Sequence, residues 1–477
     1  MASKTTLNRS NLEALGAERL AELLIEISQG SATIKRRLRL ELAGTESPIA
    51  LGKEIRKRLT TIARSRTFVD WQNRKALVDD LEAQRRAIVQ LASRLPGDGL
   101  DLMWQFLDLA KSVFERSDDS SGTISSVFHA AVIDLGNIAQ AARPDPKQLA
   151  DQVFRALVQN DYGHYDDLIS VLQPALGPVG LEHLKQRMIA LSAEPVRKSA
   201  AKERQVIGWA STGPIYADEI AERSRVSTVR LALQDIADAQ GDVDAYIAQY
   251  EPEVRKVPKI AAEIAKRLLE AGRAEEAWRT IESTEHRHRD WPDFEWEDAR
   301  LDVLEALGRS DEAQAARWSC FERFLSARHL RDYLKRLPDF DDFEAEQRAL
   351  DYAERHKGLL TSISFLVSWP ALDRAARLVT ERAKELDGNH YEILTPAAEA
   401  LAGKYPLAAT LLLRAMIDFA LMQGRSSRYG HAARHLRHSA GLASAISDYG
   451  LFETHDAYVS RLRREHGRKT AFWNMVG

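Results

Sequence analysis

The chain has 477 residues, of which 44% are hydrophobic and 29% charged, so its composition excludes general disorder and predicts a folded protein. Only 15 residues are proline and 7% are aromatic, while Ala, Leu, Arg and Glu predominate, which favours helices over strands. We therefore predict an all-α protein. The single cysteine, Cys320, excludes internal disulfide bonds, and we expect a packed small residue rather than a reactive thiol.

The net charge of −3 is distributed unevenly. Residues 1–100 hold 18 Lys and Arg against 12 Asp and Glu, and residues 425–469 hold 9 against 4, so the segment between them is acidic. The first residues lack the apolar segment of a secretory signal, and we expect the protein in the cytoplasm. Residues 406–422 come nearest to a membrane span, but they contain Arg414 and Asp418, which can pair on one helix face. We predict a core helix there.

Apolar residues at helical spacing predict successive amphipathic helices along the N-terminal half. Leu20, Leu24 and Ile27 form the first such stripe, in a helix that ends at Gly30, and a second helix runs from about residue 32 to Gly44. Further helices, each followed by Gly, Pro, Asp or Ser, are predicted at residues 54–63, 71–95, 100–114, 123–142 and 147–157. This half shows no strand alternation. We assign residues 1–195 to an N-terminal helical region that is HEAT-like or irregular.

The composition changes at residues 192–214. This segment holds small and charged residues, two prolines and no apolar period, which favours a junction between two helical regions at residues 196–214. The alternative is one charged helix inside a continuous array. We assign residues 215–477 to a second, tetratricopeptide-like region, because an internal repeat begins there.

The repeat is clearest in LEAGRAEEA at residues 269–277 and LEALGRSDEA at residues 304–313, whose glycines lie 36 residues apart. Weaker copies surround Gly241 and Gly403. The shared pattern is a helix that ends at glycine, a short turn and a second helix opened by acidic residues. This spacing is typical of helix-turn-helix hairpins that must stack to cover their apolar faces, and it predicts an α-solenoid.

The segment RYGHAARHLRH raises the question of a metal site. On a helical wheel His431, His435 and His438 fall within about 40° of one another and face away from the packed alanines and leucine. They span about 10.5 Å along the axis, which is too far for three imidazoles to share one ion. We predict exposed, partly basic helix surface. The alternative is metal binding by His431 and His435 with ligands from elsewhere.

Two further segments contain histidine. EHRHRDW, residues 285–291, spaces His286 and His288 by two residues, which indicates a loop between helices. NDYGHYDD, residues 160–167, gathers His164 and aspartates around a glycine, which predicts a turn that caps the next helix, with an ion or substrate site as the alternative. The sequence lacks phosphate-loop, dinucleotide, zinc-protease, serine-hydrolase and paired-cysteine motifs, so we predict no cofactor, no metal and no catalytic residues.

Five stretches are similar to a known family: LGAERLAELLIEIS, FERSDDSSGTI, NDYGHYDDLI, RYGHAARHLRH and REHGRKTAFW. Over most of its length the chain resembles an uncharacterised family of bacterial helical-repeat proteins, a domain of unknown function. The last two stretches also resemble the helical C-terminal region of SWIM zinc-finger proteins. The finger itself needs several cysteines, which this chain lacks. The resemblance therefore implies a helical scaffold without zinc binding.

Three functions are compatible with these features, and the first is our leading hypothesis. It is a non-catalytic scaffold that binds a protein or peptide partner. The second is nucleic-acid binding through the basic N- and C-terminal segments. Its candidate residues are Lys35, Arg36, Arg37, Arg39, Arg56, Lys57, Arg58, Arg64 and Arg66. The third is an enzyme of unrecognised type, which a pocket formed by Asp118, Asp119, Tyr162, His164 or Asp166 would favour. We expect no membrane association, and the oligomeric state stays open.

Overall fold

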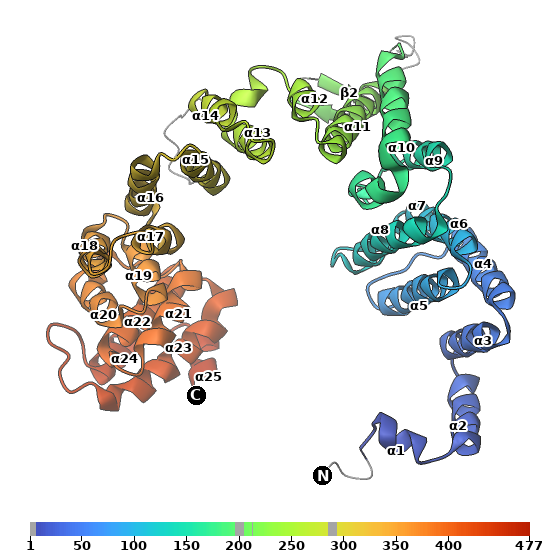
Figure 1. The fold of residues 1–477 in the computed structure, drawn as a ribbon. Coiled ribbons are helices and arrows are strands. Elements are labelled where there is room, and N and C mark those ends of the chain that lie inside the picture. Colours follow the sequence, from blue (N-terminus) through green and yellow to red (C-terminus); the bar gives the residue numbers. More distant parts are fainter. Residues whose placement is uncertain (1–5, 196–204, 212, 285–292) are drawn as a thin grey trace. The chain divides into compact units, whose positions relative to one another are not determined.

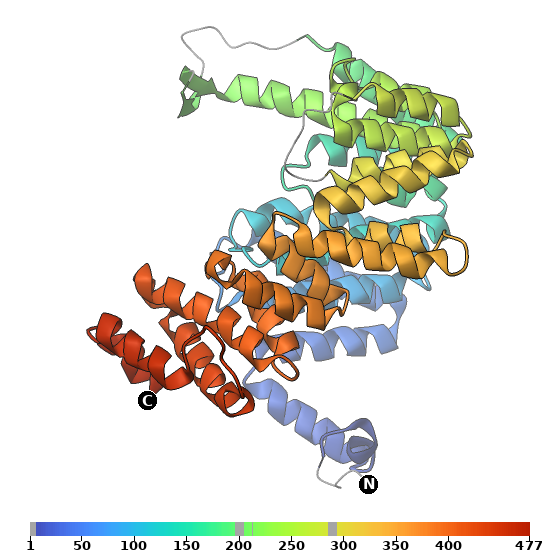
Figure 2. The same ribbon diagram turned by 90° about the vertical axis from the view of Figure 1, so that its left-hand side faces the viewer.

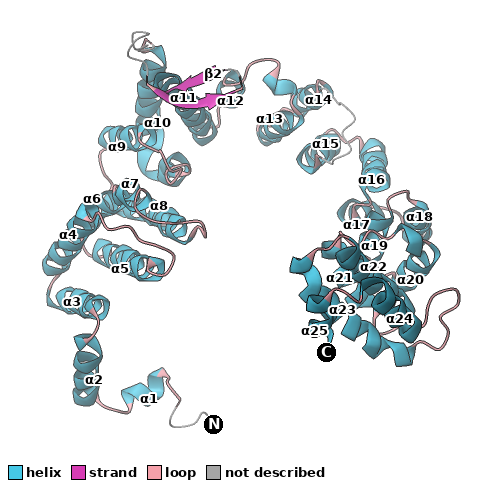
Figure 3. Cartoon of the chain, turned by 180° about the vertical axis from the view of Figure 1, so that it is seen from behind, coloured by secondary structure: helices cyan, strands magenta, loops and turns pink. Residues whose placement is uncertain are grey.

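The computed structural model describes residues 6–195, 205–211, 213–284 and 293–477. Helices form nearly all of its secondary structure, which confirms the predicted all-α class (Figures 1 and 3). The chain divides into two compact units. Unit 1 comprises Met1–Glu251 and unit 2 comprises Pro252–Gly477.

Unit 1 is a stack of helices in which most helices pack on the next and several also on the next but one, as in an α-solenoid. Its core is one cluster of buried side chains that extends from Leu40 to Ile236. The elements of unit 1 are α1 (Arg9–Glu13), α2 (Ala17–Gln29), α3 (Ala32–Glu46), α4 (Pro48–Arg64), α5 (Arg74–Ala92), α6 (Pro96–Leu107), α7 (Leu109–Phe114), α8 (Thr123–Ala142), α9 (Pro146–Val158), α10 (Leu168–Ala193), β1 (Val206–Ala210), β2 (Gly213–Tyr216), α11 (Ala217–Gln240) and α12 (Val243–Ala248).

Helix α4 shows how local sequence and burial together define an element of unit 1. The Ser47 side chain accepts a hydrogen bond from the backbone N–H of Ala50, and Pro48 occupies the first turn, where a missing N–H costs nothing. Leu51, Ile55 and Leu59 then recur every four residues and are buried. The helix therefore begins six residues before the predicted position, because the cap and not the first apolar residue sets its start.

The predicted junction at residues 196–214 holds a feature that the sequence reading missed. Most of it, residues 196–204 and 212, lies outside the described residues, but β1 and β2 pair there as an antiparallel hairpin at the start of α11 (Figures 2 and 3). Helices α10 and α11, on either side, pack on each other. The division between the two compact units falls further along the chain, after Glu251.

Unit 2 shows the same neighbour-on-neighbour packing, with buried apolar side chains in several successive clusters. Its elements are η1 (Val254–Lys256), α13 (Pro258–Glu270), α14 (Ala274–Glu282), α15 (Phe294–Ala306), α16 (Ser310–Phe324), α17 (Ala327–Leu334), α18 (Asp341–Arg355), α19 (Leu359–Ser368), α20 (Leu372–Glu381), η2 (Ala383–Glu385), α21 (Tyr391–Leu401), α22 (Pro406–Met422), η3 (Ser426–Arg428), α23 (Tyr429–Leu442), η4 (Ala443–Ala445), α24 (His455–His466) and α25 (Thr470–Val476).

The glycines of the internal repeat end helices as predicted in three of the four copies. Gly241, Gly272 and Gly308 have φ values of 68°, 73° and 69°, in the left-handed region that favours glycine. After Gly272, the N–H of Arg273 bonds to the carbonyl of Leu268 at 2.7 Å, as in a Schellman motif. The fourth copy differs, because Gly403 has no positive φ. Any residue fits the backbone there.

Helix α22 is the predicted core helix, but its two charged residues do not pair with each other. Arg414 is 5% exposed, donates to the backbone oxygen of Glu453 at 2.7 Å and lies 4.4 Å from the Tyr458 ring centroid. Asp418 accepts from the Tyr458 hydroxyl at 2.9 Å and from Arg461 at 3.3 Å. The predicted pair is therefore wrong, because α24 and the loop before it supply the partners. Every helix among the described residues is too short or too polar to cross a membrane.

The close approach of residue 388 to α22 gives a test of the packing in unit 2. A Cβ atom at Gly388 would lie 2.0 Å from the carbonyl oxygen of Ala415 and 2.8 Å from Phe419 Cβ. Gly388→Ala should therefore lower the free energy of unfolding by about 1–3 kcal/mol, as overpacking does. The control Gly403→Ala meets nothing within 4 Å and should leave it unchanged or raise it slightly. Urea unfolding of both variants measures this, and equal midpoints would contradict the packing.

Candidate functional site

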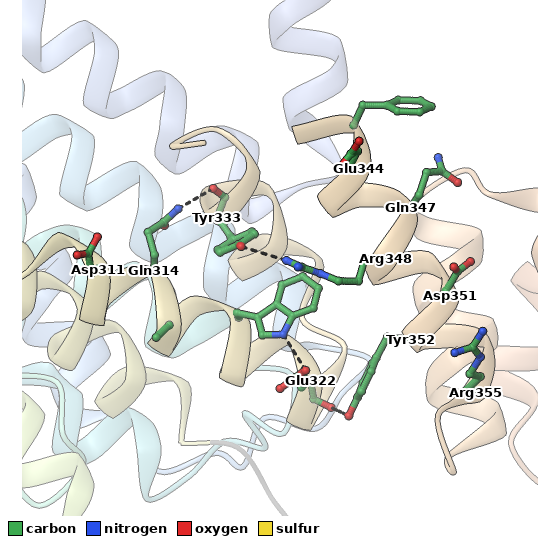
Figure 4. Close-up of a pocket in the computed structure, with 13 residues that line it drawn as sticks. Asp311, Gln314, Glu322, Tyr333, Glu344, Gln347, Arg348, Asp351, Tyr352 and Arg355 are labelled. Atoms are coloured by element: carbon green, nitrogen blue, oxygen red, sulfur yellow. Dashed lines mark hydrogen bonds between the residues drawn. The ribbon is translucent and has the colours of Figure 1, made fainter. Parts of the chain in front are cut away.

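A groove of about 940 Å3 lies between α16, α17 and α18 in unit 2 (Figure 4). Its walls are helix faces defined by spacing. Helix α16 buries Ala313, Ala316 and Phe321 in the core, so the residues at 314, 318 and 322 lie on another face, toward the groove. Helix α18 buries Ala345 and Ala349, and its residues 344, 348, 351 and 355 line the opposite side. The same amphipathic pattern that builds the core therefore leaves two polar helix faces opposed.

Three half-buried aromatic side chains, Trp318, Tyr333 and Tyr352, line this groove. The ring centroids of Trp318 and Tyr333 are 5.2 Å apart, and Trp318 is 5.3 Å from Phe321, which is fully buried. Phe321 also contacts Tyr352 at 6.0 Å. The half-buried rings are therefore continuous with the core. Half-buried aromatic rings are typical of the anchoring points of protein interfaces.

Hydrogen bonds hold the Trp318 and Tyr352 rings and the backbone of Tyr333. The Trp318 indole N–H donates to the Glu322 carboxylate at 2.7 Å, and the Tyr352 hydroxyl donates to the Glu322 backbone oxygen at 3.2 Å. Gln314 donates to the backbone oxygen of Tyr333 at 3.1 Å. Burial raises the pKa of Tyr352, with a further contribution from Glu322, so its hydroxyl remains a donor. The groove is a preformed surface rather than a set of mobile side chains.

The lining of the groove is more acidic than basic. Its carboxylates are those of Asp311, Glu322, Glu344 and Asp351, and its cations are Arg348 and Arg355. A hydrogen bond from Arg374 holds the pKa of Asp351 below its ordinary value. Acidic side chains next to exposed aromatic rings suit a ligand that is both positively charged and apolar.

The basic residues predicted to contact nucleic acid lie on α3 and α4, except Arg66, which follows α4. Lys35, Arg37, Arg39, Arg56 and Lys57 are exposed. Arg36 is half-buried and donates to Thr33 at 3.1 Å. Arg58 bonds through Nε to the buried carboxylate of Asp80 at 2.9 Å and so joins α4 to α5. Arg58 therefore has a structural role, whereas the neighbouring cations are exposed to solvent.

One face of α4 carries a row of cations that the sequence reading did not define. Lys53, Arg56, Lys57 and Arg64 recur at spacings of three, four and seven or eight residues, and all four are exposed. The opposite face carries the buried Leu51, Ile55, Leu59 and Ile62. We call the four cations the α4 stripe. A helical wheel would have found it, had the wheel been centred on the apolar face of this helix.

The NDYGHYDD segment forms a turn, but its aspartates do not cap α10. Gly163 adopts a positive φ of 71°, the Asn160 amide donates to Asp166 at 2.7 Å, and Asp167 makes no capping bond with its side chain. His164 is 7% exposed and packs 4.0 Å from the Tyr165 ring centroid. The turn is therefore organised by Asn160, and the predicted capping role of the aspartates is wrong.

The residues named for a possible enzyme do not converge on one site. Asp119 accepts from the backbone N–H groups of Ile124 and Ser125 and caps α8, while Asp118 accepts from Ser120. A hollow of about 770 Å3 between α6, α7 and α9 includes His164 in its lining, but not Asp118, Asp119, Tyr162 or Asp166.

A serine–histidine–aspartate contact series in unit 2 also has a structural explanation. Ser326 Oγ lies 2.7 Å from Nδ1 of His329, and Nε2 of His329 lies 3.3 Å from Asp298. The Ser326 side chain is the N-cap of α17, and the imidazole is 1% exposed. These contacts therefore fasten the start of α17 to α15.

The histidines of α23 do not share one environment. His431 and His438 are exposed as predicted, and Arg434 donates to Nδ1 of His431 at 2.8 Å. His435 is instead half-buried and lines a small cavity of about 290 Å3 with Tyr391 and Met416, so exposure of all three was a wrong prediction. Burial lowers the pKa of His435 to about 4. The helical wheel of α23 does not show that α21 and α22 cover one of its histidines.

The remaining candidates are a cysteine and two histidines. Cys320 is buried as predicted, and burial raises the pKa of its thiol to about 12, with a contribution from Glu297, so the reactive thiolate is disfavoured. His286 and His288 lie outside the described residues. Among the residues that the structure describes, no group of three or more His, Cys, Asp or Glu side chains is arranged to hold a metal ion.

Comparison with known proteins places the chain in a family. The family of unknown function DUF6880 matches residues 2–475, so the chain belongs to it, as the resemblance to an uncharacterised family predicted. No curated protein matches the chain. Among solved structures, a circular tandem repeat protein with novel repeat topology and enhanced subunit contact surfaces matches at 15% identity over 96% of this chain and 95% of its own. The TM-score is 0.15, so nothing about the fold or the groove is inferred from that structure.

The buried histidine of unit 1 makes the stability of that unit depend on pH. Burial lowers the pKa of His164 to about 4, whereas an unfolded histidine has a pKa of about 6.5. Below pH 6.5 the unfolded chain takes up a proton that the folded chain binds only near pH 4, so stability should fall across this interval. His164→Phe should remove this part of the pH dependence. NMR titration of the His164 ring with a midpoint near 6.5 would contradict the buried placement.

Proposed function

We propose that this protein is a non-catalytic helical-repeat scaffold that binds a segment of a partner protein in the groove of α16, α17 and α18. The observation that supports this most strongly is the set of three half-buried rings in one groove, Trp318, Tyr333 and Tyr352. Hydrogen bonds hold Trp318 and Tyr352 in place before any partner arrives, and the Tyr333 ring packs against Trp318, so little side-chain freedom is lost on binding. Rigid aromatic side chains are the groups that most often dominate binding energy.

The chemistry of the groove defines the partner segment. The exposed carboxylates of Asp311 and Glu344 favour a basic segment, and the rings favour apolar or planar side chains next to the basic ones. The lining of α18 extends from Phe343 to Arg355, a rise of about 18 Å. An extended chain of about five residues covers that distance. We therefore propose a short basic segment rather than a folded domain as the ligand of this groove.

We propose in addition that the C-terminal region is tetratricopeptide-like and similar to the helical part of SWIM proteins. We also propose that the protein is bacterial and located in the cytoplasm. Membership of a family of unknown function and the αL glycines of the repeat agree with a helical-repeat scaffold. The proposal is more specific than the hypothesis from the sequence, because it names the groove that binds the partner and the chemical class of the partner segment.

Loss of the central ring should weaken binding without unfolding the protein. Peptides selected by display on the full-length protein should be enriched in basic residues next to apolar ones. Trp318→Leu should lower the affinity of such a peptide by about ten- to thirty-fold, the size expected of a central aromatic anchor. Isothermal titration calorimetry with a synthetic peptide measures this.

The matched control is Trp71→Leu, which replaces an exposed tryptophan of unit 1 and should leave the affinity unchanged. Circular dichroism should give the same helix content for both variants. The proposal fails if display enriches no peptide, or if the enriched peptides bind equally well to the Trp318→Leu protein.

A second function, nucleic-acid binding, is supported by a different observation. The α4 stripe of Lys53, Arg56, Lys57 and Arg64 puts four exposed cations on one helix face over a rise of about 16 Å. Rows of lysine and arginine are typical of surfaces that contact a phosphate backbone. Arg58 is not part of this surface, because its guanidinium is bonded to Asp80.

This alternative predicts a salt-dependent affinity that the α4 stripe controls. If it holds, binding of duplex DNA or single-stranded RNA should weaken linearly on a logarithmic salt scale. The triple variant Lys53→Gln, Arg56→Gln, Lys57→Gln should reduce that slope by about two to three, close to one unit for each charge removed. A control that neutralises the exposed Lys335, Lys357 and Lys404 of unit 2 should not change the slope. Absence of binding at low salt would exclude this function.

A further inference from the structure

We propose that Trp318 and Tyr333 form a binding site for a guanidinium group of the partner, and that Arg348 occupies this site while the partner is absent. The inference rests on the proposed function, because it names the side chain that the same groove receives. It adds a regulatory contact, since the chain then carries its own competitor for the site.

The contacts of Arg348 show that the site recognises guanidinium. Its central carbon lies 4.4 Å from the Trp318 ring centroid, and one of its amino groups donates to the Tyr333 hydroxyl at 3.2 Å. Figure 4 shows Arg348 reaching from α18 toward Tyr333. A planar cation over an indole and an N–H donated to a phenol are the two contacts by which aromatic side chains hold arginine. Arg348 therefore makes the same two contacts that we propose for an arginine of the partner.

The receptor part of this contact is rigid and the arginine is not. The Trp318 indole is held by Glu322 and packs on the fully buried Phe321. The Tyr333 ring packs 5.2 Å from the Trp318 ring, and its backbone is held by Gln314. Arg348 instead comes from another helix and is exposed. Withdrawal of Arg348 would therefore leave the two rings in position.

Arg348 can leave its position without breaking an ion pair. Among the described residues, no carboxylate forms a salt bridge with Arg348. Arg374 on α20 differs, because it pairs with Asp351 at 2.5 Å and with Glu354 at 3.3 Å. Arg348 thus gives up one ring contact and one hydrogen bond, and an incoming arginine restores both. The net binding free energy of the partner is reduced by the contacts that Arg348 loses, so Arg348 weakens binding.

Guanidinium is favoured over ammonium as the group that enters. A lysine ammonium is compact and strongly hydrated, whereas guanidinium is planar, less hydrated and carries donors on its edge for the Tyr333 hydroxyl. The carboxylates of Asp311 and Glu344 line the same groove and attract either cation. The negative charge therefore attracts arginine-rich and lysine-rich segments alike, and the contact with the Trp318 ring favours the arginine-rich ones.

The test uses the full-length chain with fluorescein-labelled hexa-arginine and hexa-lysine as probes, followed by fluorescence anisotropy. Arg348→Gln and Arg355→Gln each remove one positive charge from the groove, but only the first removes a cation from the Trp318 ring. Arg348→Gln should raise the affinity for hexa-arginine about two- to five-fold more than Arg355→Gln does. For hexa-lysine the two variants should change the affinity by much more similar factors.

A double-mutant cycle assigns the effect to the ring. In the Trp318→Leu background the excess effect of Arg348→Gln on hexa-arginine should disappear. Equal effects of Arg348→Gln and Arg355→Gln, or a loss of affinity in Arg348→Gln, would overturn the competitor role of Arg348. If binding depends on Trp318 but Arg348→Gln has no larger effect than Arg355→Gln, only this inference is contradicted. Binding that does not depend on Trp318, or no binding, contradicts the proposed function as well.

Discussion

Burial of one apolar face of each helix against its neighbours is the constraint on which the rest of unit 2 depends. Helix α16 has to place Ala313, Ala316 and Phe321 in the core, because their combined burial offsets the conformational entropy lost on folding. With these residues inside, the helical period leaves Trp318 and Glu322 on the other side. The groove is thus a geometric consequence of core formation.

The rigidity of the groove has the same origin. Phe321 is fully buried, and its ring centroid lies 5.3 Å from Trp318, 6.0 Å from Tyr352 and 5.4 Å from Phe365. One core ring therefore contacts two of the exposed rings as well as α19. The lining rings are held by their packing on the core, while the side chains of Asp311, Glu344, Arg348 and Arg355 around them are exposed. A surface with packed rings and exposed charges suits selection of a side-chain class over recognition of one long sequence.

Much of the fold could be predicted from the sequence, because its elements depend on local patterns. The helical period and the glycines at 241, 272 and 308 indicated helices and their ends correctly. The hairpin of β1 and β2 was missed, because its strands are only five and four residues long and Gly208 interrupts the apolar pattern. The start of α4 was predicted too late, because the apolar period alone does not include the cap formed by Ser47 and Pro48.

The candidate site could not be predicted in the same way. Trp318, Tyr333 and Tyr352 lie on three helices, and no local spacing relates them. A helical wheel gives the direction of a side chain on its own helix but not the element that covers it. The same limit explains His435, which α21 and α22 cover, and Arg414, whose hydrogen-bond partner lies in the loop before α24. Tertiary packing supplied this information in each case.

The most direct test of the account is an NMR titration of the tryptophan indole N–H groups. The chain has 9 tryptophans, and the Trp318→Leu variant identifies the Trp318 resonance by its loss. Addition of hexa-arginine should shift the indole resonance of Trp318 with saturation and leave that of Trp71 in unit 1 in place. An unchanged Trp318 resonance, or equal shifts of all the indole resonances, would contradict the claim that this groove is the binding surface.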